Sequence, residues 1–410
     1  MSAVGTDSIS HTPSRSAASR GPAPVVGVVN AGSSSLKFSI YQAETRILSG
    51  AVTGIGVHPE VKIAGASGEK LAPPEVGSTS IADAGAALIW LLPWLERQMA
   101  GRKLAAVGHR VVHGGALHDA PEQVTPELLQ ELTALVPLAP LHQPHNLAPM
   151  RVLMQSAPEL PQVACFDTAF HRTIPEIAQA FALPRGLRDK GVRRYGFHGL
   201  SYEYITSALP SVAPELAGGR VIVAHLGNGA SLCAMHEGRS VATTMGFSAL
   251  DGLPMGTRCG ELDAGVVLFL LEHESMSPAD IEDVLYRRSG MLGLSEISSD
   301  FRDLLASPDP RARFALDLFA YRIVRGIGSL AAALGGVDGI VFTAGIGENA
   351  AAVRAAVCAG CSWLGLELDQ AANDRNEARI TRQNSRVAAY VIPTDENLMI
   401  ARHSRALIGA

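Results

Sequence analysis

The segment Val25–Tyr41, VVGVVNAGSSSLKFSIY, has the clearest strand–turn–strand pattern of the chain. Val25–Asn30 is a continuous run rich in β-branched residues that ends in the turn-forming Asn-Ala-Gly-Ser-Ser-Ser, and Leu36–Tyr41 resumes the strand pattern. The segment therefore predicts a β-hairpin whose tip carries backbone N–H groups, hydroxyls and Lys37, a combination suited to phosphate. An ordinary polar hairpin tip is the alternative, and the GxxxxGK[ST] spacing of a P-loop is absent.

A second unit of the same construction lies near the middle of the chain. Arg220–His225 (RVIVAH) is followed by Leu-Gly-Asn-Gly-Ala and then by Ser231–His236. Elsewhere helical patterns alternate with short strands such as Gly339–Thr343, which indicates α/β layers with helices on the faces of mixed sheets. We expect two related α/β halves with a cleft between them. The helical patterns cover Ile81–Met99, Pro126–Leu135, Ala264–Glu272 and Ala312–Leu334.

Composition and charge exclude several classes of partner. The 410 residues are 47% apolar, enough for two domain cores, and a net charge of −5 without a long Lys/Arg block leaves no basic footprint for nucleic acid. The best candidate for a membrane span, Ala84–Leu95, is far shorter than the ~20 residues required and contains a proline. Five cysteines, an odd count, argue against a disulfide framework and indicate the reducing cytoplasm.

Two arginines are candidates for anion binding. Arg110 lies two residues into a hydrophobic strand in GHRVVHGG, where an unpaired guanidinium is costly, so it needs a partner. That partner is either a structural carboxylate or a substrate phosphate. Arg258 lies between two glycines in MGTRCG, a loop that leaves the guanidinium free to meet an anion, and an ordinary surface arginine is the alternative.

Three further segments have weaker signals. Thr343–Asn349 (TAGIGEN) lies between a strand and the helical pattern Ala350–Cys358, and its glycines would let a nucleotide approach the backbone, although it lacks the third glycine of GxGxxG. His109 and His113 would lie ~13 Å apart on a strand, too far for shared zinc ligation. The CxxC pair formed by Cys358 and Cys361 has no second pair, so buried helix cysteines are expected.

Ten motifs occur in order along the chain. They are VVNAGSSSLKFSIY, GHRVVHGG, LAPLH, CFDTAFH, RRYGFHG, HLGNGASLCAMHEG, MGFSALDGLPMGTRCG, SSDFRD, FTAGIGEN and IPTDENL. Over about residues 25–402 this ordered set closely resembles the acetate kinase family.

The resemblance implies a fold and an assembly. The fold is a duplicated ribonuclease-H-like α/β fold of two domains with a central cleft, and the assembly is a homodimer. We expect a first domain over residues 25–166, completed by residues 397–410, and a nucleotide-binding second domain over residues 167–396. Residues 1–24 have no counterpart in the family, and their Ser, Ala, Pro and Gly content predicts a disordered N-terminal extension.

The resemblance also implies the reaction. It is the reversible in-line transfer of the γ-phosphoryl group of ATP to acetate, which gives acetyl phosphate and ADP, with Mg²⁺ as cofactor and Mn²⁺ as a substitute. Such a transfer needs charge neutralisation around the phosphoryl group and alignment of its two end oxygens. The expected partners are these small molecules and a second copy of the chain.

The family's catalytic positions carry over to matched residues. Arg110 and Arg258 would clamp the transferring phosphoryl group and the acyl carboxylate, and His198 would hydrogen-bond the equatorial oxygens of the transition state. Asp167 would orient the metal–phosphate group, and His142 is a further active-site histidine. The family's Mg²⁺ positions, whose oxygens suit a hard ion that retains several waters, are Asn30, Asp167 and Glu396.

The nucleotide and acyl positions carry over in the same way. Phosphate, ribose and adenine would be bound by Ser33, Ser35, Lys37, His225, Asn228, Gly229, Asp300, Phe301, Arg302, Gly345, Ile346, Gly347 and Asn349. For His225 a purely structural role is the alternative. The apolar pocket for the methyl group of acetate would consist of Val112, Leu141, Phe197 and Ala249.

The chain departs from the family pattern beside these positions. Ala249 stands where the family usually has a proline of the acyl pocket, and an apolar pocket discriminates one methylene by only ~1–3 kcal/mol. A propionate kinase on the same scaffold is therefore the alternative function. Other differences lie at Gln143, His145, Leu200, Tyr202 and Asn397.

Two more distant functions fit the pattern less well. A sugar kinase would need a carboxylate base and a polar acceptor pocket. An actin-like filament protein would keep the nucleotide segments without Arg110, Arg258 and His198.

Overall fold

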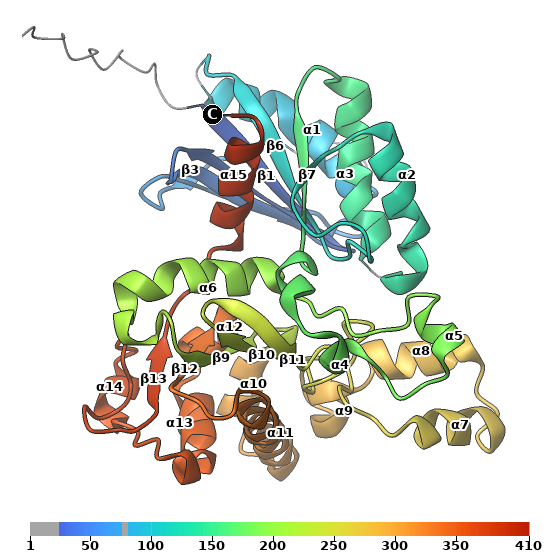
Figure 1. The fold of residues 1–410 in the computed structure, drawn as a ribbon. Helices are drawn as coiled ribbons and strands as arrows, with labels where there is room; N and C mark the ends of the chain where they lie inside the picture. The colour runs from blue at the N-terminus through green and yellow to red at the C-terminus, as the bar shows by residue number, and fades with distance from the viewer. Residues whose placement is uncertain (1–23, 76–80, 100, 141, 410) are drawn as a thin grey trace, which may run out of the picture.

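The computed structural model describes residues 24–75, 81–99, 101–140 and 142–409 (Figure 1). The predicted N-terminal extension, except for Pro24, and the predicted acyl-pocket residue Leu141 lie outside the described residues. The described part contains two mixed β-sheets with helices packed on their faces. No helix of this part is both long enough and apolar enough to cross a lipid bilayer.

The first sheet is built around the predicted hairpin. Strand β1 (Val25–Ala31) pairs antiparallel with β2 (Ser35–Gln42) and parallel with β6 (Leu104–Val111). The sheet has 8 strands in the order β5-β4-β3-β2-β1-β6-β8-β7. The other strands are β3 (Thr45–Thr53), β4 (Glu60–Gly65), β5 (Lys70–Leu71), β7 (Glu122–Gln123) and β8 (Gln162–Phe166).

The second sheet repeats this construction. Its 5 strands have the order β11-β10-β9-β12-β13, in which an antiparallel trio is followed by two parallel strands. The order matches β3-β2-β1-β6-β8 of the first sheet, so the predicted duplication of an α/β unit is confirmed. The strands are β9 (Arg220–Leu226), β10 (Ala230–His236), β11 (Arg239–Thr243), β12 (Gly339–Thr343) and β13 (Ala388–Val391).

Helices cover both faces of the first sheet. Helix α1 (Ala84–Gln98) packs Leu91 and Trp94 against one face, which α3 (Gln143–Ser156) also covers. Helix α15 (Glu396–Leu407), from the far end of the chain, packs on the opposite face across β1, β6 and β8 (Figure 1). The C-terminal residues therefore complete the first half of the molecule. The domain limits at 166/167 and 396/397 stay a prediction.

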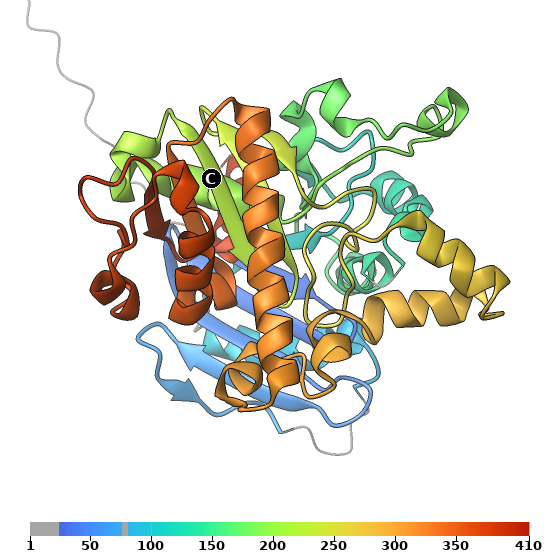
Figure 2. The ribbon, with the colours of Figure 1, turned by 90° about the horizontal axis from the view of Figure 1, so that it is seen from below.

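The second sheet is likewise covered on both faces. The long helix α11 (Pro310–Leu334), the orange helix of Figure 2, packs Phe319 and Ile323 against one face. Helix α6 (Gly199–Val212) packs Ile205 against the other face and also touches α15, so it joins the two halves.

The remaining helices border the two sheets. Four of them are longer than eight residues: α2 (Pro126–Ala134), α7 (Ala264–Glu272), α8 (Pro278–Arg287) and α13 (Ala351–Gly360). The short ones are α4 (Glu176–Gln179), α5 (Arg185–Arg188), α9 (Gly290–Ser295), α10 (Phe301–Ala306), α12 (Ala344–Asn349) and α14 (Gln370–Asp374). The 3₁₀ turns are η1 (Val136–Leu138), η2 (Ala169–Thr173), η3 (Pro214–Leu216) and η4 (Ser362–Leu364). The four predicted helices occur at their predicted places within three residues at each end.

The TAGIGEN motif contains a short helix of its own. Its residues form α12 directly after β12, ahead of the helix predicted from Ala350. The carbonyls at the end of such a short helix need partners. They find one because the buried Arg354 donates to the carbonyl oxygens of Gly347 and Glu348 at 3.0 and 2.9 Å.

Candidate active site

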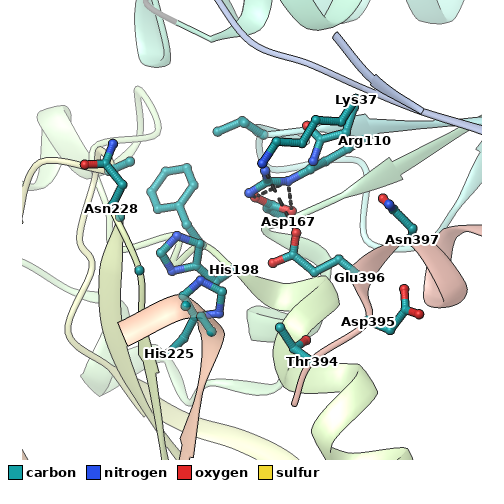
Figure 3. A pocket seen from close by; sticks show the side chains of 18 of the residues that line it. Lys37, Arg110, Asp167, His198, His225, Asn228, Thr394, Asp395, Glu396 and Asn397 are labelled. Atoms are coloured by element: carbon teal, nitrogen blue, oxygen red, sulfur yellow. Dashed lines mark hydrogen bonds and ion pairs between the residues drawn. The ribbon is translucent and has the colours of Figure 1, made fainter. Parts of the chain in front are cut away.

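A cavity of about 540 Å³ lies between the two halves. The first half contributes Asn30 at the end of β1 and Arg110 near the end of β6, and the second contributes His225 on β9. Asp167 and His198, from the segment between the sheets, also line it (Figure 3). The predicted central cleft therefore exists, and it collects polar side chains from both halves.

Arg110 is paired with a carboxylate in the cleft. Its Nε donates to Asp167 Oδ1 at 3.0 Å and its Nη2 to Oδ2 at 2.6 Å, a bidentate pair, while Nη1 lies 4.0 Å from Glu396 Oε2. Burial raises the pKa of Asp167, and the Arg110 guanidinium opposes that rise. Of the two partners expected for Arg110, a structural carboxylate or a substrate phosphate, the structure contains the carboxylate.

Arg258 is different because no carboxylate of the described residues pairs with it. Its Nη1 donates to the carbonyl oxygen of Ala249 at 2.6 Å, and burial together with the charge of Arg110 lowers its pKa. Gly229 allows the close approach, since a Cβ there would lie 3.2 Å from Arg258 Nη2 and 3.1 Å from His198 Nε2. Within the described part of the chain, the cleft thus contains a guanidinium without an anionic partner, as an anion-binding site requires.

Two histidines stack on each other beside the arginines. The rings of His198 and His225 lie 4.1 Å apart, and their Nδ1 atoms lie 2.8 Å from the hydroxyls of Ser231 and Ser201. Burial lowers the pKa of His198 far below 6.5 and that of His225 to about 3, so both rings are neutral near pH 7. His142, also in the cleft, has its pKa lowered to about 4, first by burial and then by the two arginines.

The backbone at His198 is strained. This residue precedes α6 with φ 59° and ψ 25°, a left-handed conformation that is uncommon for a residue with a side chain. The helix start is pressed against Asp167, because a Cβ on Gly199 would lie 2.2 Å from the Asp167 carbonyl oxygen. This packing fixes His198 and Asp167 relative to each other.

A buried amide holds the two strand ends that carry Asn30 and Arg110. Asn146 on α3 donates from Nδ2 to the carbonyl oxygen of Ala31 at 2.7 Å and accepts at Oδ1 from the backbone N–H of Val112 at 2.9 Å. Asn146 is buried, and no motif of the sequence pointed to it. It is a scaffold residue that only the fold reveals.

A second cavity of about 610 Å³ adjoins the first and shares Asn228 and Gly345 with it. Phe301 forms part of its floor, is 5% exposed, and packs edge-on against Phe319 at 4.7 Å. The predicted nucleotide residues that line this cavity are Asn228, Asp300, Phe301, Arg302, Gly345, Ile346 and Asn349.

Most of the predicted residues line the first cavity, and Asn228 and Gly345 line both cavities. The first cavity is lined by Asn30, Lys37, Arg110, Val112, His142, Asp167, Phe197, His198, His225, Asn228, Gly229, Ala249, Arg258, Gly345 and Glu396. Ser33, Ser35 and Gly347 line neither cavity: Ser33 is exposed, Ser35 closes the hairpin turn through its carbonyl, and Gly347 is buried inside α12. Their roles stay predictions.

Several cleft residues were missed from the sequence. Asp395 and Thr394 belong to the IPTDENL motif, so their position beside Glu396 was the available signal. Arg46 on β3 had no motif, and Glu348 lies within TAGIGEN without a distinguishing feature. Asn397 was noted only as a departure from the family, and it lines the same cleft (Figure 3).

Comparisons with known proteins give the family. The model of the Acetokinase family matches residues 25–402. An acetate kinase of Rhodopseudomonas palustris is 56% identical over 391 residues, covering 92% of this chain and 97% of that protein. The crystal structure of Porphyromonas gingivalis acetate kinase has 35% identity and a TM-score of 0.85, covering 94% of this chain and 100% of the other. A propionate kinase from Francisella tularensis has 33% identity and a TM-score of 0.87, with 93% and 99% covered. The chain therefore belongs to the acetate kinase family and is a phosphotransferase.

Proposed function

We propose that the cleft transfers the γ-phosphoryl group of ATP reversibly to acetate, giving acetyl phosphate and ADP. The observation that carries the proposal is the Arg258 guanidinium, which has no carboxylate partner among the described residues and lines the cleft with Arg110. The buried side chains of Val112 and Phe197 line the same cavity. A short carboxylate with an apolar tail suits this combination of charge and apolar surface.

The chemistry needs little from a base. A carboxylate acceptor is already ionised at pH 7, so Asp167, held by Arg110, is free to act as an orienting charge. Arg110 and Arg258 neutralise charge on the moving phosphoryl group. The neutral His198 donates from Nε2 to its equatorial oxygens, and such preorganised donors lower the barrier because they need no rearrangement during transfer.

The donor set fits Mg²⁺, with Mn²⁺ as a substitute. Asn30, Asp167 and Glu396 bring one amide and two carboxylates to the cavity. Among the described residues no group of three His, Cys, Asp or Glu side chains forms a complete metal cage. Mg²⁺ commonly binds through one or two carboxylates plus substrate phosphates and water, which agrees with this sparse set. When bound, the ion would neutralise phosphate charge.

The nucleotide, the assembly and the location complete the proposal. The second cavity, with Phe301 and Ile346, would receive adenine and ribose. A homodimer is supported by α7, which has no buried residue and exposes Val266, Leu268 and Phe269 although it is apolar on all sides. Five free cysteines support a cytoplasmic location.

The test of the function is the specificity constant for acetate, propionate and butyrate, measured with ATP and Mg²⁺ and with hydroxylamine trapping of the acyl phosphate. We expect acetate to be preferred over propionate by roughly 10–200-fold, the range that one methylene allows. Failure to phosphorylate any of the acids would refute the proposal. Propionate equal to acetate or better would favour the alternative, a propionate kinase on the same scaffold.

The variant Ala249→Pro probes the acyl pocket directly. Ala249 lines the cleft and gives its carbonyl to Arg258, so a proline ring there narrows the apolar pocket without removing that acceptor. We expect the ratio of acetate to propionate specificity constants to rise by about threefold to tenfold, within the range of one methylene. An unchanged ratio in a folded variant would remove Ala249 from substrate selection.

Tyr202 is expected to position His198. Its buried phenol lies within hydrogen-bond distance of Ser231 Oγ and has no other hydrogen-bond partner among the described residues. Ser231 Oγ in turn lies 2.8 Å from His198 Nδ1. If the phenol donates a hydrogen bond to Ser231 Oγ, the serine hydroxyl donates in turn to His198 Nδ1, which acts as the acceptor. The N–H of the neutral ring is then at Nε2, facing the cleft.

We therefore expect Tyr202→Phe to lower kcat by about tenfold with little change in KM. The measurement is steady-state kinetics beside a melting curve, with Tyr204→Phe on the same helix as the control. A kcat within twofold of the parent would show that Tyr202 does not set the tautomer of His198.

A further inference from the structure

A third cavity, of about 680 Å³, adjoins the catalytic cleft on the first sheet. Lys37, Arg46 and Asn397 line both cavities, so the two are continuous. The third cavity extends from them over β2, β3, β4 and β5. It lies on the face of the sheet opposite α1, beyond the strands that α15 covers.

The strand register explains how this face is built. Residues paired on adjacent strands form rows that run across the sheet. One row contains Lys37, Ala51 and Lys62, and the next row on the same face contains Ser39, Ser49, Ala64 and Lys70. In both rows small side chains lie between or beside lysines. Because adjacent strands are ~4.8 Å apart, Lys37 and Lys62 start roughly 10 Å apart with only a methyl group between them. The rows thus form a shallow basin with cationic margins.

The rows of lysines and small side chains occur on one face of the first sheet, and the residues that alternate with them are apolar. Phe38, Ile63 and Leu71 alternate with the rows above; they also border the cavity, and they belong to the core cluster beneath α1. Gly50, which pairs with Phe38, leaves room for the phenyl ring, because a Cβ at position 50 would lie 2.5 Å from Phe38 Cζ.

The charge of this cavity is positive. Among the described residues that line it, four have cationic side chains and none is Asp or Glu. Glu69 turns to the other face, where it approaches Gly65 and accepts from Ser67, and Glu60 lies one row farther along β4 outside the cavity. Within the described part of the chain, none of the four cations, Lys37, Arg46, Lys62 and Lys70, forms an ion pair.

The concentration of lysines in this cavity does not result from a lysine-rich chain. The chain has only five, at positions 37, 62, 70, 103 and 190, and three of them line this one cavity. An ammonium on a flexible stem can turn toward any face of a bound anion, whereas arginine prefers planar, bidentate partners. Gathering lysines around a basin without carboxylates therefore favours a compact, multiply charged ligand.

We propose that this cavity binds a small anion with three or more negative charges, a tricarboxylate or an inorganic oligophosphate, and that its occupancy alters turnover in the adjoining cleft. The volume is that of a small-molecule site. The coupling would pass through Lys37 and through Asn397, which donates to Ser39 Oγ at 3.1 Å and follows Glu396 in the chain. The claim about turnover rests on the proposed kinase function, and the claim about binding does not.

The experiment uses the full chain with citrate and with tripolyphosphate as separate probes, without Mg²⁺ and with ADP saturating the nucleotide site. Titration calorimetry is run on the parent, on Lys62→Ala/Lys70→Ala, and on the matched control Lys103→Ala/Lys190→Ala. Lys62 and Lys70 line only the third cavity, so the first double variant should keep the kcat that the parent has without anion. We expect Kd to rise at least tenfold in that variant and to stay unchanged in the control.

Amine labelling followed by mass spectrometry gives an independent readout on the unmodified protein. Bound anion should slow labelling of Lys62 and Lys70 several-fold, with Lys103 and Lys190 as internal references. Protection by citrate alone identifies a carboxylate ligand, and protection by tripolyphosphate alone identifies a phosphate ligand. Equal affinity of both double variants, or no selective protection, would overturn the site.

The effect on turnover is measured separately with Mg²⁺ held at a fixed free concentration. We expect the bound anion to change kcat or KM at least twofold in the parent and not in Lys62→Ala/Lys70→Ala. Binding without any kinetic change would overturn the coupling. A protein that binds the anion but phosphorylates none of the acids would contradict the proposed function and leave the binding site in place.

Discussion

Replacing Arg258 with alanine is expected to lower kcat by on the order of 10²-fold or more, equivalent to about 2.7 kcal/mol of lost transition-state stabilisation. The reason is the position of this guanidinium in the cleft without a carboxylate partner among the described residues, so that its charge is available to the substrate. Its removal leaves no buried carboxylate unpaired. The fold should therefore survive, and the loss should be chemical.

Steady-state kinetics in both directions, beside a melting curve, measure this effect. Arg258→Lys keeps the positive charge but lacks the planar guanidinium that can donate two hydrogen bonds to one anion, so we expect intermediate activity. The control is Arg322→Ala, an arginine on α11 that is paired with Glu261 outside the cleft. A kcat of Arg258→Ala near that of the parent would exclude Arg258 from the chemistry.

Arg110 gives a less direct test, although it lines the same cleft. Its removal leaves Asp167, which is 1% exposed, without its bidentate partner, and breaking a buried pair in this way costs about 3–5 kcal/mol of stability. Arg110→Ala is thus expected to lose both activity and stability. Only the comparison with Arg258→Ala separates the two effects.

Much of the fold was predictable because its signals are local. The β-branched run before Asn30 and the RVIVAH run before Leu226 each lead into a glycine turn, and the structure has a hairpin at both places. The packing of α15 on the first sheet has no local signal, because that contact joins residues more than 350 positions apart, as between Tyr41 and Asp395. Only the family resemblance pointed to it.

How much of a residue's role in the site could be predicted from the sequence differs from residue to residue. Arg110 could be recognised as needing a partner because a charge inside an apolar strand is costly. The identity of its anionic partner depends on the pairing of β6 with β8, because Asp167 directly follows β8 and thereby lies beside Arg110. The hydrophobic periodicity of the sequence does not reveal which strands pair. Ser33 and Ser35 lie in the motif at the hairpin tip, but of that segment it is Asn30 and Lys37, paired across β1 and β2, that line the cleft. Arg46 enters the cleft through sheet geometry alone.

Replacing Arg354 with methionine is expected to lower the free energy of unfolding by about 3–5 kcal/mol, which corresponds to roughly 10 °C in melting temperature. Arg354 is fully buried on α13. Its Nε donates to Asn373 Oδ1 at 2.8 Å, its Nη2 to the Asn373 carbonyl at 2.9 Å, and its Nη1 to the carbonyls that end α12. Methionine fills much of the space but leaves these acceptors without donors, and each buried orphan costs about 1–3 kcal/mol.

The same contacts connect stability with nucleotide binding. The carbonyls that Arg354 holds belong to Gly347 and Glu348, while Gly345 and Ile346 of the same short helix line the proposed adenine and ribose cavity. We therefore expect Arg354→Met to raise KM for ATP more than KM for acetate, because the loosened helix carries Gly345 and Ile346 of the nucleotide cavity and none of the predicted acyl-pocket residues. Thermal unfolding and two-substrate kinetics measure both effects, with Arg375→Met, an exposed arginine paired with Glu377, as the control. If both variants melt within 2 °C of the parent, the buried guanidinium is not what holds α12, and the order of this helix must come from its contacts with β9 and β12.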